Sequence, residues 1–222
     1  MNYYLGIDIG TTGIKTVIFD GEGVPKGIGL AEYTLETPKP DIVELDAEIY
    51  WESTRKALKQ AIEASAVNPD EIRSLAVTGQ AETLIMVDAN NNPLRKAIVW
   101  LDNRAVDEAA ELDKKFTTEA LFRMSGQTEM LPCWPAAKIL WYRKNEPQLF
   151  AQTAKYLMVE DFIIAKLTGK YATCNGLMPS SLYYDIRTGK YDQAMLETLG
   201  ISEKQLPELK NAGEIAGVCI EN

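Results

Sequence analysis

The stretch Leu5-Gly-Ile-Asp8-Ile-Gly10-Thr-Thr-Gly13-Ile-Lys15 decides the fold of this 222-residue chain. Apolar and β-branched residues on both sides of a small-residue turn predict two strands, over residues 3–9 and 14–20. A glycine turn signal and a third strand over 24–33 follow. The chain is therefore expected to open with an antiparallel meander of three strands.

The remainder of the sequence predicts an α/β order. Asp46 is a suitable N-cap for a helix that runs to about residue 66, because apolar residues then recur at helical spacing. Three strands, a helix and further strands are typical of an α/β fold with a mixed sheet. Beyond Asn103 the pattern becomes mainly helical. The further strands are expected at 72–78, 83–88 and 97–100, and the further helices at 104–115, 117–125, 135–145, 156–167 and 192–199.

The composition excludes several classes of function. Apolar residues make up 46% of the chain and charged residues 25%, which are ordinary values for a globular protein that can bury a substantial core. With 23 Lys and Arg against 32 Asp and Glu, the net charge is −9, which excludes most electrostatic binders of nucleic acid or membranes. Because the sequence has no histidine, Ser-His and Cys-His triads and His-ligated zinc are excluded too.

The three cysteines indicate a reducing compartment. Cys133, Cys174 and Cys219 are far apart and odd in number, so they form neither a CxxC metal pair nor a disulfide framework. No apolar run approaches the roughly 18–20 residues of a membrane span. The N-terminus has no basic region typical of a signal peptide. We therefore expect a cytoplasmic protein with neither a membrane nor a nucleic acid as partner.

The first turn suits a phosphate group. The strand over 3–9 delivers Asp8 at its end, and Gly10-Thr11-Thr12-Gly13 then exposes backbone N–H groups and two hydroxyls. Glycine permits close approach of an anion, Asp8 can hold Mg²⁺ directly or through water, and Lys15 adds a cation. The alternative is a plain β-hairpin in which the glycines only make the turn, and the motif alone favours neither. It is not a Walker A motif.

Two further polar groups follow apolar strands and suit a polyol. Gln80 and Glu82 can hydrogen-bond sugar hydroxyls, although a charged hairpin turn is the more frequent meaning of such a segment. The Trp100 ring can cover an apolar C–H face while Asp102 and Arg104 bind hydroxyls. On its own, a core Trp followed by the N-cap of a helix is the commoner arrangement.

Taken together and in order, these segments resemble the N-terminal domain of the FGGY carbohydrate kinases. That family phosphorylates sugars and polyols with ATP and Mg²⁺, and it includes xylulokinases and glycerol kinases. The resemblance covers nearly the whole chain. It rests on Leu5–Lys15, on the strand ending Val77-Thr-Gly-Gln80, on Ala97-Ile-Val-Trp100-Leu-Asp102-Asn-Arg104, on Lys138-Ile-Leu-Trp141, on Lys166-Leu-Thr-Gly169, and on Asp192–Leu199 with the residues after it.

The resemblance implies a fold. It is the ribonuclease H-like domain shared by actin, the 70-kDa heat-shock chaperones and hexokinases. The opening meander, the crossover helix and the following strands are what this fold requires. We therefore expect a mixed five-stranded sheet and a helical insertion after about residue 103.

The resemblance also implies an activity and a set of site residues. The activity is transfer of a phosphoryl group from ATP to a hydroxyl of a sugar or polyol, as in a xylulokinase. Asp8 would act through Mg²⁺ as the catalytic and metal-binding residue. The nucleotide phosphates would contact Gly10, Thr11, Thr12, Gly13 and Lys15, and the sugar would contact Gln80, Glu82, Trp100, Asp102 and Arg104.

The sequence departs from the family at the substrate site. After the equivalent of Gln80, xylulokinases typically carry Met-His and glycerol kinases Arg-Glu, whereas this chain has Ala81-Glu82. Glu82 therefore matches the glycerol-kinase acid, but its basic partner is missing. A small ketose and a linear polyol both remain open as substrates.

The second departure concerns length. Members of the family are longer, and the Asp that acts as general base would lie past Asn222, in a second domain. We expect residues 1–222 to be the phosphate- and sugar-binding half, without the C-terminal domain, and to fold without measurable turnover. An exposed apolar face near the C-terminus would then favour self-association, as in a homodimer. The alternative is a non-catalytic fragment or interaction module that keeps the kinase fold.

Overall fold

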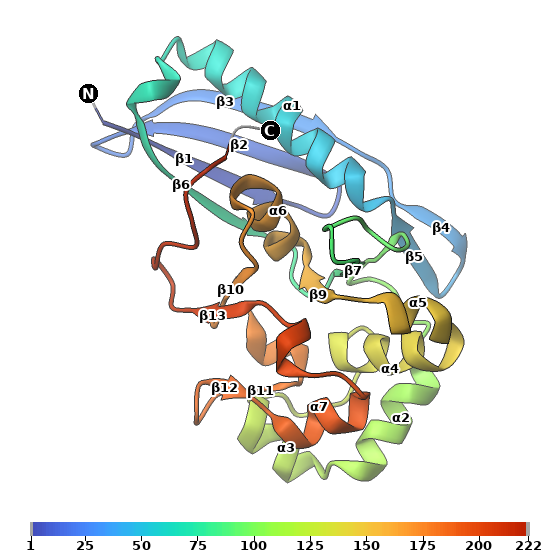
Figure 1. Ribbon diagram of the computed structural model, residues 1–222. Helices are drawn as coiled ribbons and strands as arrows, with labels where there is room; N and C mark the ends of the chain where they lie inside the picture. Colours follow the sequence, from blue (N-terminus) through green and yellow to red (C-terminus); the bar gives the residue numbers. More distant parts are fainter. Residues whose placement is uncertain (1, 221–222) are drawn as a thin grey trace. The chain divides into compact units, whose positions relative to one another are not determined.

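The computed structural model describes residues 2–220, and Figure 1 shows the course of the chain. The chain divides into two compact units. Unit 1 consists of the residues up to Leu35 together with Asp46–Gln80. Unit 2 consists of Glu36–Leu45 together with the residues from Ala81 onward.

Unit 1 contains the predicted meander. Strands β1 (Tyr3–Ile9), β2 (Gly13–Asp20) and β3 (Pro25–Glu32) pair antiparallel in sequence order. Helix α1 (Ala47–Ser65) then leads, through the short 3₁₀ helix η1 (Pro69–Glu71), to β6, which pairs parallel to β1. With β6 at Ile72–Gly79, the sheet has the order β3-β2-β1-β6 and is mixed. The meander, the helix after it and the parallel strand are therefore confirmed.

Helix α1 begins at the predicted N-cap, where the Asp46 carboxylate accepts a hydrogen bond from the backbone N–H of Glu48 at 3.0 Å. Its fully buried residues are small for the most part, namely Ala47, Tyr50, Thr54, Ala57 and Ala61. The reason is the close approach of β3 along Gly27 and Gly29. A Cβ atom on Gly29 would lie 1.9 Å from the carbonyl oxygen of Ala57.

Gly29→Ala is therefore expected to lower the free energy of unfolding by about 1–3 kcal/mol, because the strand and helix must move apart. Urea denaturation of the purified chain measures this. Gly6→Ala is a matched control in the same sheet, since its Cβ atom would meet nothing nearer than a Phe19 ring carbon at 3.9 Å. Equal unfolding free energies for the two variants would contradict the close-approach argument.

The predicted strand count of the mixed sheet was wrong. Among residues 2–220 this sheet has four strands rather than five, because β7 (Leu84–Val87) pairs in another sheet. The polar interruption after Gly79 explains the difference. Glu82 adopts a left-handed backbone conformation (φ 63°), so the chain turns before β7 begins instead of continuing beside β6.

Unit 2 contains a five-stranded sheet with the order β4-β5-β8-β7-β9, in which every described pairing is antiparallel. Strands β4 (Glu36–Lys39) and β5 (Ile42–Leu45) form a hairpin in a segment for which the sequence predicted no strand. The prolines and charged residues of β4 resemble a loop because this strand is at the sheet edge and is exposed along its length. Strands β8 (Ala97–Ile98) and β9 (Lys155–Met158) complete the sheet.

The predicted helical region is confirmed, with one correction. The helix expected over 156–167 begins only at Val159, since Tyr156–Met158 belong to β9. The Asp161 carboxylate accepts a hydrogen bond from the backbone N–H of Met158 at 2.9 Å and so fixes the helix start. The helices are α2 (Val106–Lys115), α3 (Thr118–Ser125), α4 (Pro135–Asn145), α5 (Pro147–Gln152), α6 (Val159–Thr168) and α7 (Gln193–Leu199).

Short elements complete unit 2. Strand β10 (Ala172–Cys174) pairs parallel with β13 (Glu208–Lys210), and β11 (Tyr184–Asp185) pairs antiparallel with β12 (Lys190–Tyr191). The remaining elements are the 3₁₀ helices η2 (Met178–Ser181) and η3 (Glu203–Gln205).

Two properties of the described residues concern membrane spans and exposed apolar side chains. Over residues 2–220, none of the helices combines the length and the apolar character that a membrane span requires. Apolar side chains are exposed near the C-terminus, where Ile215 is 82% and Val218 81% accessible. Self-association through this region stays a prediction.

Candidate functional site

The predicted phosphate turn lies at the end of the β1–β2 hairpin. Asp8 and Lys15 are directly opposite each other in the antiparallel register, and both side chains are exposed. Alternate residues of β1, such as Ile7 and Ile9, are buried, so Asp8 lies on the opposite face of the strand. The backbone N–H of Gly10 donates to the carbonyl of Gly13 at 2.9 Å and closes the turn.

Both glycines of the turn are required by the local backbone. A Cβ atom on Gly13 would lie 2.9 Å from the carbonyl oxygen of Ala31, and one on Gly10 would lie 3.0 Å from the carbonyl oxygen of Gly13. Thr12 is exposed and Thr11 half-buried at the turn. The glycines thus have a structural cause, as in a plain hairpin, and their presence alone does not distinguish a phosphate site.

Tyr33 supports the turn, and the sequence did not predict this. Its hydroxyl donates a hydrogen bond to the carbonyl of Gly10, and its backbone N–H donates to the carbonyl of Thr12 at 3.1 Å. The Tyr33 ring packs edge-on against Tyr50 at a centroid distance of 5.3 Å. Burial, and then the nearby Tyr50 and Asp8, raise the pKa of the Tyr33 hydroxyl, so it stays a donor at neutral pH.

The exposed face of this hairpin carries a groove of about 250 Å³. Asp8 and Lys15 line it together with the strand residues Gly6, Ile7, Val17, Phe19, Ala76, Val77 and Thr78. Among residues 2–220, neither Asp8 nor Lys15 has a hydrogen-bonded or ion-paired side-chain partner in the structure. Both charges are therefore available to a ligand.

These residues fit a magnesium–nucleotide phosphate better than a metal held by protein alone. The part of the chain that the structure describes has no cluster of three or more metal-ligating side chains. Mg²⁺ is commonly held by one or two carboxylates together with substrate phosphates, and Asp8 supplies one exposed carboxylate. Lys15 adds a positive charge on the same face.

Gln80 follows β6 in unit 1. Its backbone N–H donates to the carbonyl of Ile9 at 2.8 Å, and its side-chain amide donates to the hydroxyl of Tyr50 at 3.1 Å. Its side-chain oxygen is buried and has no hydrogen-bond partner in the described residues. An orphaned buried acceptor of this kind fits a donor supplied by a ligand.

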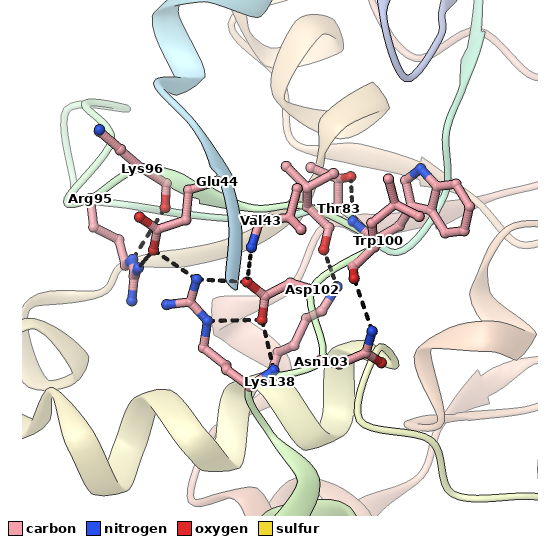
Figure 2. Close-up of polar contacts among 12 residues, drawn as sticks. Val43, Glu44, Thr83, Arg95, Lys96, Trp100, Asp102, Asn103 and Lys138 are labelled. Carbon is pink, nitrogen blue, oxygen red and sulfur yellow. Dashed lines mark hydrogen bonds and ion pairs between the residues drawn. The ribbon is translucent and has the colours of Figure 1, made fainter. Parts of the chain in front are cut away.

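Glu82 and Trp100 lie in unit 2, on two loops that are both contacted by the buried side chain of Lys138. Figure 2 shows Trp100, Thr83 and Lys138. The Lys138 ammonium donates to the carbonyl oxygens of Glu82 and Val99, each at 2.9 Å. The backbone N–H of Trp100 donates to the hydroxyl of Thr83 at 3.1 Å. Trp100 is 36% exposed, and its ring points away from Asp102 in Figure 2.

Burial lowers the pKa of Lys138 to about 7, against the opposite effects of Asp102, Cys133 and Glu82. A lysine with such a pKa inside unit 2 was not predicted as a site residue. Lysines are mostly exposed, and only the packing of α4 makes this one inaccessible.

Asp102 and Arg104 form a buried network in unit 2 (Figure 2). The Asp102 carboxylate is fully buried and accepts four hydrogen bonds, from the Val43 N–H at 2.7 Å and from the backbone, Nε and Nη2 of Arg104 at 3.0, 2.8 and 2.7 Å. The Arg104 guanidinium also contacts Glu44 at 2.8 Å and lies over the Trp141 ring at 4.8 Å. The alternative of a core Trp followed by a helix N-cap does not describe this segment, since Trp100 is partly exposed and the N-cap of α2 is Ala105 without a side-chain hydrogen bond. Asp102 and Arg104 bind each other, and sugar binding by this pair stays a prediction.

The network extends to Arg95. Its guanidinium pairs with Glu44 and with Glu146, the latter at 2.5 Å, and lies 5.6 Å from the centre of the Trp141 ring. Glu44 thus holds two guanidinium groups and connects β5 with the segments that follow β7 and β8. No sequence pattern pointed to Glu44, because no strand was predicted for its segment.

The predicted site residues consequently fall into two groups. Unit 1 holds Gln80 and the hairpin residues Asp8, Gly10, Thr11, Thr12, Gly13 and Lys15. Unit 2 holds Glu82, Trp100, Asp102 and Arg104. The structure adds Tyr33 and Tyr50 to the first group, and Lys138, Thr83 and Glu44 to the second.

Comparisons with known proteins agree with the resemblance. Residues 3–222 match the FGGY family of carbohydrate kinases, N-terminal domain. A glycerol kinase of Thermococcus gammatolerans is 32% identical over 221 residues, covering 97% of this chain and 44% of that protein. A xylulose kinase of Escherichia coli is 28% identical over 217 residues, covering 98% of this chain and 44% of that protein. The chain thus spans less than half the length of these relatives.

A solved structure confirms the fold class. The crystal structure of Plasmodium falciparum glycerol kinase with ADP superimposes with a TM-score of 0.90 at 25% identity, covering 100% of this chain and 45% of the other. The predicted ribonuclease H-like fold is therefore shown.

Proposed function

Because the chain belongs to the FGGY family of carbohydrate kinases, we propose that it binds nucleotide phosphate and sugar in a kinase that phosphorylates a hydroxyl of a small ketose or linear polyol. The exposed Asp8–Lys15 pair beside the Gly10–Gly13 turn carries this proposal. These two oppositely charged side chains line the same groove, and in the described part of the chain neither has a hydrogen-bonded or ion-paired partner. That arrangement suits a metal-bound phosphate better than a hairpin of purely structural purpose.

The chain's own residues position the phosphates. Asp8 holds the metal side of a magnesium nucleotide, and Lys15 and the turn N–H groups approach the phosphoryl oxygens. Mg²⁺, when bound, neutralises phosphate charge. ADP in the structure of a glycerol kinase of the same fold supports ATP as the phosphoryl donor.

The sugar contacts that we propose lie in unit 2, where the Glu82 carboxylate accepts a hydroxyl hydrogen and the exposed part of the Trp100 ring covers a C–H face. In unit 1, Gln80, whose side-chain oxygen has no hydrogen-bond partner among the described residues, stays a predicted sugar ligand. Glycerol and xylulose kinases among the relatives support a small polyol or ketose. Ala81 supplies no basic group, so the choice between them rests on Glu82 and its surroundings.

The experiment that tests the function has two parts. Residues 1–222 are titrated with Mg·ADP and with metal-free ADP, and tighter binding of the magnesium complex is expected. The full-length kinase that contains this chain is then assayed with ATP against a panel of ketoses and linear polyols. Absence of phosphorylation across the whole panel would contradict the proposal. Residues 1–222 alone are expected to show no turnover, because they span only 44% of the length of the glycerol kinase and xylulose kinase that they match.

Glu82→Ala in the full-length kinase is expected to raise the KM for the sugar about ten- to hundredfold, because a charged hydrogen bond of about 1.5–3 kcal/mol is lost. Steady-state kinetics at saturating Mg·ATP measure it. Glu119→Ala is the matched control, since Glu119 is an exposed acid on α3 paired only with Arg123 in the structure. If the KM values for every sugar stayed unchanged in Glu82→Ala, Glu82 would lie outside the site.

A further inference from the structure

The strongest unassigned feature is Lys138, a fully buried cation beside predicted sugar residues. It comes from α4, and its ammonium donates to two backbone carbonyls on two different loops, Glu82 and Val99. Glu82 is a predicted sugar residue, and Val99 is joined by its carbonyl to Trp100, another one. One side chain therefore contacts the backbone at both places.

The backbone at Glu82 needs such a contact. Its φ of 63° is a left-handed conformation, which a residue with a Cβ atom adopts only when the surroundings hold it there. The Lys138 bond to the Glu82 carbonyl is one restraint. The hydroxyl of Thr83, which accepts the Trp100 N–H, is the second tie between the same loops.

The role of Lys138 rests on its hydrogen bonds rather than on a full positive charge. Burial, as the largest effect, and the Arg104 guanidinium lower the pKa of Lys138, while Asp102, Cys133 and Glu82 favour its protonated form. Removal of this donor leaves the part-buried Glu82 carbonyl without the hydrogen bond from Lys138, whereas the Val99 carbonyl still accepts from the backbone N–H of Asp102 at 2.9 Å. The two loops then lose the side chain that contacts both of them.

We propose that Lys138 is the positioning residue for the sugar subsite, fixing the Glu82 carboxylate and the Trp100 ring in the places where they bind the substrate. The expected effect of Lys138 on sugar binding during catalysis rests on the proposed function. The structural part of the assignment, the tie between two loops, stands on the two hydrogen bonds alone.

The chain offers a matched control in Lys155. This lysine also donates to two backbone carbonyls, those of Lys204 at 2.7 Å and Leu206 at 3.0 Å, but neither belongs to a predicted site segment. Burial lowers its pKa as well. Lys155→Met therefore also removes a lysine that donates to two backbone carbonyls, but it leaves the hydrogen bonds at Glu82 and Val99 unchanged.

The test compares Lys138→Met with Lys155→Met in the full-length kinase. Lys138→Met is expected to raise the KM for the sugar at least about tenfold and to leave the KM for Mg·ATP unchanged. Lys155→Met is expected to change neither. Methylammonium should partly restore the sugar KM in Lys138→Ala and have no effect in Lys155→Ala. A rise in both KM values, or no rise in the sugar KM, would overturn the assignment.

A second readout separates this inference from the proposed function. Amide hydrogen exchange of the purified chain is expected to accelerate at Thr83 and Trp100 in Lys138→Met and not in Lys155→Met. If the kinase accepts no sugar but exchange accelerates locally, the loop tie is supported and the proposed function fails. If exchange is unchanged at both amides, the tie is refuted. Should Lys138→Met fail to fold, Lys138→Gln, which keeps a shorter N–H donor, carries both measurements with smaller expected changes.

Discussion

Asp8→Ala in the full-length kinase is expected to lower kcat about 10²- to 10³-fold at saturating Mg·ATP, with the free energy of unfolding nearly unchanged. The decrease in kcat is expected because the variant lacks the negative charge that would face the metal-bound phosphates. Removal of one preorganised electrostatic contact lowers kcat by about this factor. The fold survives because the Asp8 side chain is exposed and forms no hydrogen bond or ion pair in the part of the chain that the structure describes, while the backbone pairing of β1 does not depend on that side chain.

The measurements are steady-state kinetics, urea denaturation and titration of residues 1–222 with Mg·ADP, which should bind the variant more weakly. Glu22→Ala is the matched control, because Glu22 is an exposed acid in the β2–β3 turn of the same unit. Wild-type kcat in Asp8→Ala would refute the metal role. Loss of folding would show that Asp8 serves the hairpin instead.

Asp102→Ala is expected to lower the free energy of unfolding by about 3–5 kcal/mol, because it leaves a buried guanidinium without its carboxylate. Arg104 would lose two side-chain hydrogen bonds, and the buried N–H of Val43 would lose its acceptor. Glu44 would remain as a partner of Arg104, which keeps the loss within this range.

Thermal and urea denaturation of the purified chain measure this, with Asp113→Ala on the exposed side of α2 as control. The same variant separates the two roles considered for Asp102. A stability loss below about 1 kcal/mol together with a raised sugar KM would favour direct sugar binding over the structural network. A large stability loss supports the network.

The sequence by itself determined the first hairpin and the helix after it. Runs of apolar and β-branched residues and the small-residue turn between them are local properties, so the meander, the turn and the N-cap at Asp46 could be predicted from the residues alone. The polar residues around Gln80 and Trp100 could also be identified from the sequence, because each of these two polar segments follows an apolar strand. Their meaning as a sugar site came from the family resemblance.

Only the tertiary structure decided where those residues lie and what they contact. The edge strand β4 has no apolar pattern, and its pairing with β5 follows from the sheet of unit 2. Residues distant in sequence, Glu44, Asp102 and Arg104, meet through charge pairing that no local pattern specifies. Lys138 looks like an ordinary surface lysine until α4 packs, because burial and hydrogen bonding of a side chain depend on elements that are far away along the chain.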